Sequence, residues 1–121
     1  MNKILVGEDD SFLSNAYRVK LTKAGFEVKI ARDGQEVIDS LGEFAPDLII
    51  LDLIMPVKDG FTTLSEIKAN NRWKNIPVIV ASNLGQKEDI DKSMALGAVD
   101  YIVKSNMPIN SVVEKINSIL K

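Results

Sequence analysis

The sequence contains no cysteine and no histidine among its 121 residues. The lack of cysteine excludes disulfides, thiolate metal sites and thiol nucleophiles, and the lack of histidine removes the commonest transition-metal ligand and the usual general base. A metal bound by this chain therefore has to be a hard cation that prefers oxygen ligands. The sequence also has no apolar run of the roughly 20 residues that a membrane-spanning helix needs, and no signal-peptide pattern at its N-terminus.

A strong excess of charge of either sign is missing as well. The chain has 15 Lys and Arg against 17 Asp and Glu, which gives a net charge of −2. Because this balance provides little attraction for nucleic acid or an anionic membrane, we expect neither as a partner. With 45% hydrophobic and 26% charged residues, the composition is that of a globular protein. We expect residues 1–121 to form one domain with a single core, located in the cytoplasm.

Short apolar runs alternate five times with stretches of helical periodicity. The expected strands cover residues 4–6, 26–30, 48–51, 78–81 and 99–103. The second run alternates strictly between apolar and polar residues, which indicates an edge strand, whereas the third is apolar throughout and indicates a strand buried on both faces. Strands that alternate with helices predict an α/β fold: a five-stranded parallel sheet of order 2-1-3-4-5, flanked by five helices, in the flavodoxin-like arrangement.

Several residues carry helix-start or turn signals. Ser11 is expected to cap the first helix, and Asp33 and Glu36 have the spacing of a capping box at the start of the second. Asp59 and Gly60 form a turn and cap before the third helix. Pro108 is suited to an early position of the last helix.

Polar side chains follow four of the five expected strands. Glu8 and Asp9 follow the first strand, Asp52 the third, Ser82 the fourth and Lys104 the fifth. The carboxyl ends of parallel strands meet at one edge of the sheet, where doubly wound folds bind ligands, so three carboxylates should crowd one crevice. Such an oxygen cluster suits Mg²⁺. A lysine and a hydroxyl beside it suit phosphoryl oxygens, which makes Asp52 the expected phosphoryl acceptor.

The motifs in this order resemble the receiver domains of two-component response regulators, the CheY-like domains, over essentially the whole chain. The resemblance rests on residues 3–10, on Asp52 with Met55-Pro56 and Asp59-Gly60, on residues 77–82 and on residues 97–104. It implies a signalling phosphoacceptor, not an enzyme in the usual sense, that takes a phosphoryl group onto Asp52 from a sensor histidine kinase, a phosphotransfer protein or a small donor such as acetyl phosphate. It also implies that the domain promotes its own phosphorylation and slow dephosphorylation.

The resemblance further assigns roles to individual residues. Asp9 would contact Mg²⁺ directly and Glu8 through water, with Asp52 and the backbone carbonyl of Ile54 completing the protein ligands. Ser82 and Lys104 would contact the phosphoryl oxygens.

A conformational switch is implied in the same way. Tyr101 would turn inward as Ser82 moves toward the phosphate, biasing two arrangements of the loops after the third and fourth strands. The readout surface would be the fourth helix, fifth strand and fifth helix, including Lys92, Met94, Tyr101 and Val113. Its partner would be an output domain or target protein of unknown identity, or a second copy of the chain upon activation.

Three features depart from the family pattern. Ser105, not proline, follows Lys104, so the shape of that loop is open. Gly7 stands where an apolar residue is usual. Ile54 and Leu84, two residues after Asp52 and Ser82, are apolar; because polar side chains there help to orient an attacking water, we expect the phosphoaspartate to hydrolyse slowly.

Three other functions are compatible with this topology. A phosphatase of the haloacid dehalogenase type needs a second aspartate two residues after Asp52, where Ile54 stands. A flavin-binding module needs a phosphate-binding loop after the first strand, where the acidic residues 8–10 have the wrong charge. A receiver-like interaction domain that is never phosphorylated stays open, as does the choice between a stand-alone protein and the first domain of a longer regulator.

Overall fold

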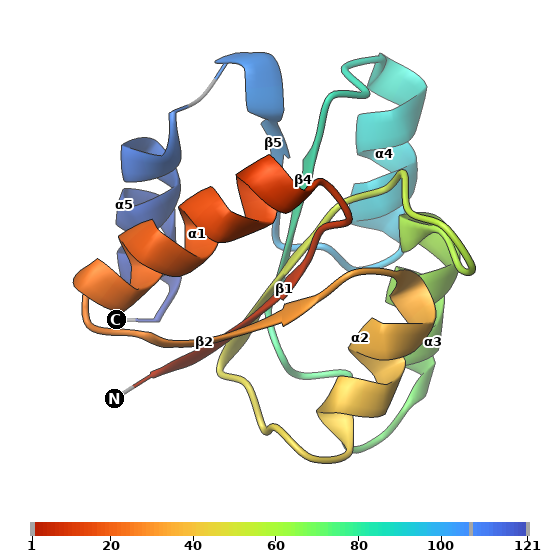
Figure 1. Ribbon diagram of the computed structural model, residues 1–121. Coiled ribbons are helices and arrows are strands. Elements are labelled where there is room, and N and C mark those ends of the chain that lie inside the picture. The colour runs from red at the N-terminus through yellow and green to blue at the C-terminus, as the bar shows by residue number, and fades with distance from the viewer. Residues whose placement is uncertain (1, 107, 121) are drawn as a thin grey trace.

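The computed structural model describes residues 2–106 and 108–120. It has five parallel strands in one sheet, in the order β2-β1-β3-β4-β5, with helices on both faces (Figure 1). The strands are β1 (Lys3–Gly7), β2 (Glu27–Ala31), β3 (Leu48–Leu51), β4 (Val78–Ser82) and β5 (Asp100–Val103). The helices are α1 (Ser11–Lys23), α2 (Gly34–Leu41), α3 (Gly60–Ala69), α4 (Lys87–Ala95) and α5 (Ile109–Ile119), and a short 3-10 turn covers Lys104–Asn106. The predicted fold and strand order are confirmed.

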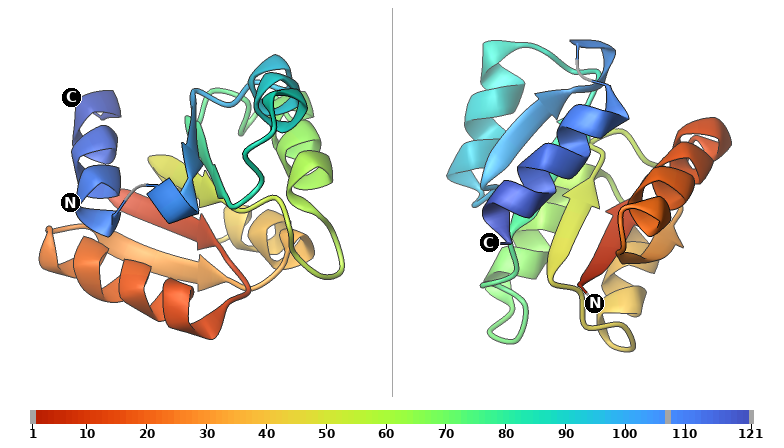
Figure 2. Two further views of the ribbon diagram at one scale, coloured as in Figure 1. Left: turned by 90° about the horizontal axis from the view of Figure 1, so that it is seen from above. Right: turned by 90° about the vertical axis from the view of Figure 1, so that its left-hand side faces the viewer.

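The sheet separates two hydrophobic cores. Successive side chains of a strand point to opposite faces, so Ile4 and Val6 of β1 belong to one core and Leu5 to the other. Helices α1 and α5 cover the first core, and they lie side by side in both views of Figure 2. Helices α2 and α3 cover the second, together with residues at the end of α4. The apolar third run is buried throughout because β3 lies at the centre of the sheet between these layers.

The strand register sets the position of the polar strand ends. Gly7 pairs with Leu51 between β1 and β3, and Ser82 pairs with Val103 between β4 and β5. The residues that follow these pairs therefore leave the sheet at the same edge. Strand β2 lies at the edge of the sheet and is only partly buried, as its alternating sequence predicts.

Aspartates begin three of the helices. Asp10, not Ser11, is the N-cap of α1, since its carboxylate accepts a hydrogen bond from the backbone N–H of Leu13, and Ser11 is the first helical residue. The prediction for Ser11 was wrong because either residue can cap, and only the backbone conformation decides between them. Asp33 and Asp59 cap α2 and α3 as predicted. Within the described residues, none of the helices combines the length and apolar character needed to span a bilayer.

Candidate functional site

Lys104 joins the first and third strand ends. Its Nζ lies 2.6 Å from Glu8 Oε1 and 3.0 Å from Asp52 Oδ2. Glu8 and Asp52 are buried, and the Lys104 side chain is only 11% exposed. Three residues from separate parts of the sequence therefore share one ion-pair network at the carboxyl edge of the sheet.

Asp9 completes a cluster of three carboxylates. One oxygen from each of Glu8, Asp9 and Asp52 lies within 4.8 Å of the others, and Asp9 is the exposed member. Three carboxylates against one ammonium leave the cluster with an excess of negative charge. All donors are oxygens, and the exposed side leaves access for water, so the residues suit a hard divalent cation such as Mg²⁺.

The electrostatics of the cluster support the same view. Burial raises the pKa of Glu8, and the charge of Asp52 raises it further, although the hydrogen bond from Lys104 acts in the opposite direction. Burial on its own would lower the pKa of Lys104, but its hydrogen bonds to Glu8 and Asp52 outweigh this effect and raise it. The lysine is thus held charged at neutral pH. Its single positive charge does not neutralise the repulsion among the three carboxylates.

The loop after β3 holds Asp52 in place. Asp52 Oδ1 accepts a 2.7 Å hydrogen bond from the backbone N–H of Leu53, and the N–H of Gly60 donates to the Leu53 carbonyl at 2.9 Å. A side chain at Gly60 would collide with the Asp52 carbonyl, so this approach requires glycine. Ile54 follows with its side chain 62% exposed. The role of its backbone carbonyl as a metal ligand stays a prediction.

Ser82 and Tyr101 meet at the loop between β4 and α4. Ser82 is fully buried, and its Oγ accepts a hydrogen bond from the N–H of Leu84 at 3.3 Å. The Tyr101 hydroxyl donates to the Leu84 carbonyl. Burial raises the pKa of Tyr101, and the charge of Asp89 raises it further. The Tyr101 hydroxyl is therefore already turned toward this loop. Among the described residues, Ser82 Oγ is bonded to the loop and not to Asp52.

Two residues near the site have roles that were not predicted from the sequence. A Cβ on Gly7 would lie 2.9 Å from Val37 Cγ2 and 3.1 Å from Leu51 Cδ1, which explains the glycine that precedes the acidic pair as a close approach of α2 to β1. Tyr17 of α1 is buried, which raises the pKa of its hydroxyl to about 12, and the charges of the site also influence it. Its only sequence signal is a tyrosine in a helical apolar stripe.

Residues Lys104–Asn106 form a compact turn after β5. Lys104 begins a 3-10 turn that ends at Asn106, and α5 begins at Ile109. Ser105 stands where the family usually has proline, and the chain still forms a compact turn there. This turn keeps Lys104 directed toward the carboxylates of Glu8 and Asp52.

Comparison with known proteins gives a consistent result. The family model for the response regulator receiver domain matches residues 4–117. The chemotaxis protein CheY of Treponema pallidum is 37% identical over 122 residues, covering 98% of this chain and 83% of that protein. The DNA-binding dual master transcriptional regulator RpaA of a Synechocystis species is 32% identical over 121 residues, covering 100% of this chain and 50% of that protein.

A solved structure extends the comparison. The Mn²⁺-bound form of the response regulator Rcp1 superimposes with a TM-score of 0.85 and 32% identity, covering 98% of this chain and 93% of that chain. The present chain spans about half the length, or less, of the first curated relatives that it matches.

Proposed function

Because this chain belongs to the response regulator receiver domain family of two-component systems, we propose that it is a signalling phosphoacceptor whose acceptor residue is Asp52. The donor is the phosphohistidine of a sensor histidine kinase or phosphotransfer protein, or a small molecule such as acetyl phosphate. The observation that carries this proposal is the position of Lys104, whose Nζ lies within hydrogen-bond distance of both Glu8 and Asp52.

The transfer step follows from this arrangement. A carboxylate oxygen of Asp52 attacks the phosphorus, a P–O bond to Asp52 forms, the P–N bond to histidine breaks, and the bonding electrons leave with the imidazole. Phosphoryl transfer depends on positioning and on stabilisation of charge on the phosphoryl oxygens. Lys104 supplies a positive charge beside the acceptor, and Ser82 supplies a hydroxyl from the neighbouring strand end.

The acidic cluster gives the metal site of the proposal. Glu8, Asp9 and Asp52 would hold Mg²⁺ with the backbone carbonyl of Ile54, and the ion would neutralise charge on the phosphoryl oxygens. The Mn²⁺-bound form of Rcp1 supports a divalent cation in a relative of the same fold. The carboxylates of this chain hold the negative charge that makes the site selective for a cation.

The output of the proposed switch lies on α4, β5 and α5. Phosphorylation adds about −1.5 to −2 charge and three acceptor oxygens. Ser82 and Lys104 respond to that charge, and both Ser82 and Tyr101 bond to Leu84, in the loop that leads into α4. The partner at this surface is an output domain, a target protein or a second copy of the chain.

Intact-mass measurement after incubation with acetyl phosphate and Mg²⁺ tests the proposal. Wild type should gain one phosphoryl group, and Asp52→Asn should gain none. Asp91→Asn, which removes an exposed aspartate of α4, is the matched control and should behave as wild type. Chelation of the metal should prevent the gain, and Lys104→Ala should accept phosphate only to a reduced degree and transmit the signal poorly. Unmodified wild type would indicate a receiver-like interaction domain instead.

Slow self-dephosphorylation is the second part of this proposal. Ile54 is exposed beside the acceptor and Leu84 is half-buried, so neither places a polar group for an attacking water. Ile54→Asn should shorten the phosphoaspartate half-life by about tenfold. This is less than the roughly 10²–10⁴-fold rate increase that a positioned general base typically provides, because asparagine only orients the attacking water. The half-life of the purified phosphoprotein measures this, and a wild-type half-life already as short as that of fast chemotaxis proteins would contradict it.

A further inference from the structure

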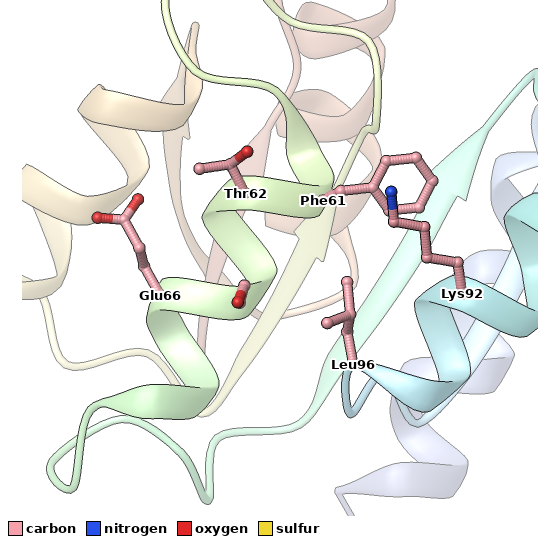
Figure 3. A pocket seen from close by; sticks show the side chains of 6 residues that line it. Phe61, Thr62, Glu66, Lys92 and Leu96 are labelled. Atoms are coloured by element: carbon pink, nitrogen blue, oxygen red, sulfur yellow. The ribbon is translucent and has the colours of Figure 1, made fainter.

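A groove of about 300 Å³ separates α3 from α4 (Figure 3). Phe61, Thr62, Ser65 and Glu66 of α3 line one side, and Lys92 and Leu96 line the other. The Lys92 side chain extends across the groove and places its Nζ over the Phe61 ring, 4.2 Å from the ring centroid. This cation–π contact spans the groove between the two helices.

The α3 side of the contact is joined rigidly to the phosphoryl acceptor. Phe61 directly follows Gly60, whose N–H donates to the Leu53 carbonyl and whose Cα is pressed against the Asp52 backbone. Phe61 also packs against the buried core under the sheet. A shift of the Asp52 backbone is therefore transmitted to the Phe61 ring without an intervening flexible segment.

Few buried contacts hold α4 before its C-terminal end. Ser93 is the only buried residue of α4, and Gln86, at its N-cap, makes no side-chain capping bond. At the far end, Gly97 packs against the stem of Lys68, whose Nζ is held by the carbonyls of Lys74 and Ile76. Because few buried contacts hold the part of α4 before this anchored end, the contact of Lys92 with Phe61 has a large share in setting its position.

We propose that the Phe61–Lys92 contact is a second connection between Asp52 and α4, parallel to the one through Ser82 and Tyr101, and that it regulates the phosphoryl switch. This inference rests on the proposed function. In the structure, the contact coexists with Tyr101 turned toward the Leu84 carbonyl, the arrangement that phosphorylation should favour. The contact therefore stabilises the active arrangement of α4. Its loss weakens the coupling between phosphorylation of Asp52 and the position of α4.

The proposal is tested by measuring the affinity of the protein for beryllofluoride, a phosphoryl analogue, in the presence of Mg²⁺. Beryllofluoride is titrated into the protein, and binding is followed by changes in the amide signals of its NMR spectrum. Lys92→Met keeps the stem and removes the charge, and Phe61→Leu keeps apolar volume and removes the ring. Each should weaken beryllofluoride binding about two- to fivefold, the range expected for an exposed cation–π contact. The double variant should be no weaker than the single variants, because both remove the same contact.

The matched control is Lys87→Met, which removes another lysine of α4, one paired with Asp91 instead of an aromatic ring. It should bind beryllofluoride as wild type does. Unchanged affinity in Lys92→Met, or additive losses in the double variant, would overturn the inference. A wild-type protein that does not bind beryllofluoride would overturn the proposed function instead, so the two failures are distinguishable.

Discussion

At the scale of single residues, Gly7 shows how a missing side chain brings α2 close to β1. A methyl group there would press on Val37 and Leu51, at 2.9 Å and 3.1 Å. We expect Gly7→Ala to lower the free energy of unfolding by about 1–3 kcal/mol through overpacking, measured by urea denaturation. Gly42→Ala is the matched control, since the nearest contact of its added Cβ is at 3.6 Å, and it should be no less stable than wild type. Equal stabilities for the two variants would contradict this explanation of Gly7.

Glu8 gives the site a pH dependence. Its pKa in the folded state is raised above 4.5, first by burial and then by Asp52. A carboxyl group whose pKa is higher in the folded state than in the unfolded state stabilises the fold while it is protonated. This contribution is fully present below the pKa of the unfolded state and is lost as the pH rises through the pKa of the folded state. In the presence of a chelator, the free energy of unfolding of Glu8→Gln should therefore increase relative to that of wild type as the pH rises from 4.5. Urea denaturation at a series of pH values measures this difference. A difference that stays constant with pH would show that Glu8 does not titrate abnormally.

At the scale of elements, the loop between β3 and α3 contains a strained residue. Val57 has a φ of +69°, which β-branched residues rarely adopt, and the N–H of Lys58 donates to the Pro56 carbonyl at 2.7 Å across this tight turn. The Val57 side chain is 82% exposed, so it gains little from packing. The strain lies in the same loop that carries Asp52 and leads into α3.

Val57→Asn should therefore stabilise the protein by about 1 kcal/mol, because asparagine tolerates positive φ and no buried contact is lost. The shift in the midpoint of thermal unfolding measures the effect. Val99→Asn is the matched control, as Val99 is also exposed but is not among the residues with positive φ. It should give no gain, and an equal gain at both positions would point to surface polarity instead of strain.

At the scale of the whole molecule, the proposed metal site predicts that a divalent cation stabilises the fold. A cation that binds only the folded chain stabilises it, by about 2.7 kcal/mol at a hundred times the dissociation constant. We expect Mg²⁺ to raise the thermal midpoint of wild type and to have much less effect on Asp9→Asn, which removes the exposed member of the cluster. Glu88→Gln, an exposed acid of α4, should respond to Mg²⁺ as wild type does. An equal response of Asp9→Asn would mean that the cation binds elsewhere.

The candidate site could be predicted from the sequence to the extent that strand ends could be located. Glu8, Asp52 and Lys104 each directly follow a strand, and parallel topology brings such positions to one edge. Tyr17 and Gly7 could not be predicted, since their roles depend on which side chains of α1 and α2 approach the sheet. The cap of α1 was assigned to the wrong residue because Asp10 and Ser11 carry equivalent signals.

The sequence by itself determined the α/β fold, the strand order and the group of polar residues at the carboxyl edge. These features follow from local periodicity and from the geometry common to all parallel sheets, so they need no knowledge of individual contacts. Only the tertiary structure decided that Lys104 pairs with Glu8 as well as Asp52, that Tyr101 faces the Leu84 carbonyl, and that Lys92 lies over Phe61. Such contacts depend on side-chain conformations and on distances between helices, which arise from the packing of the whole molecule.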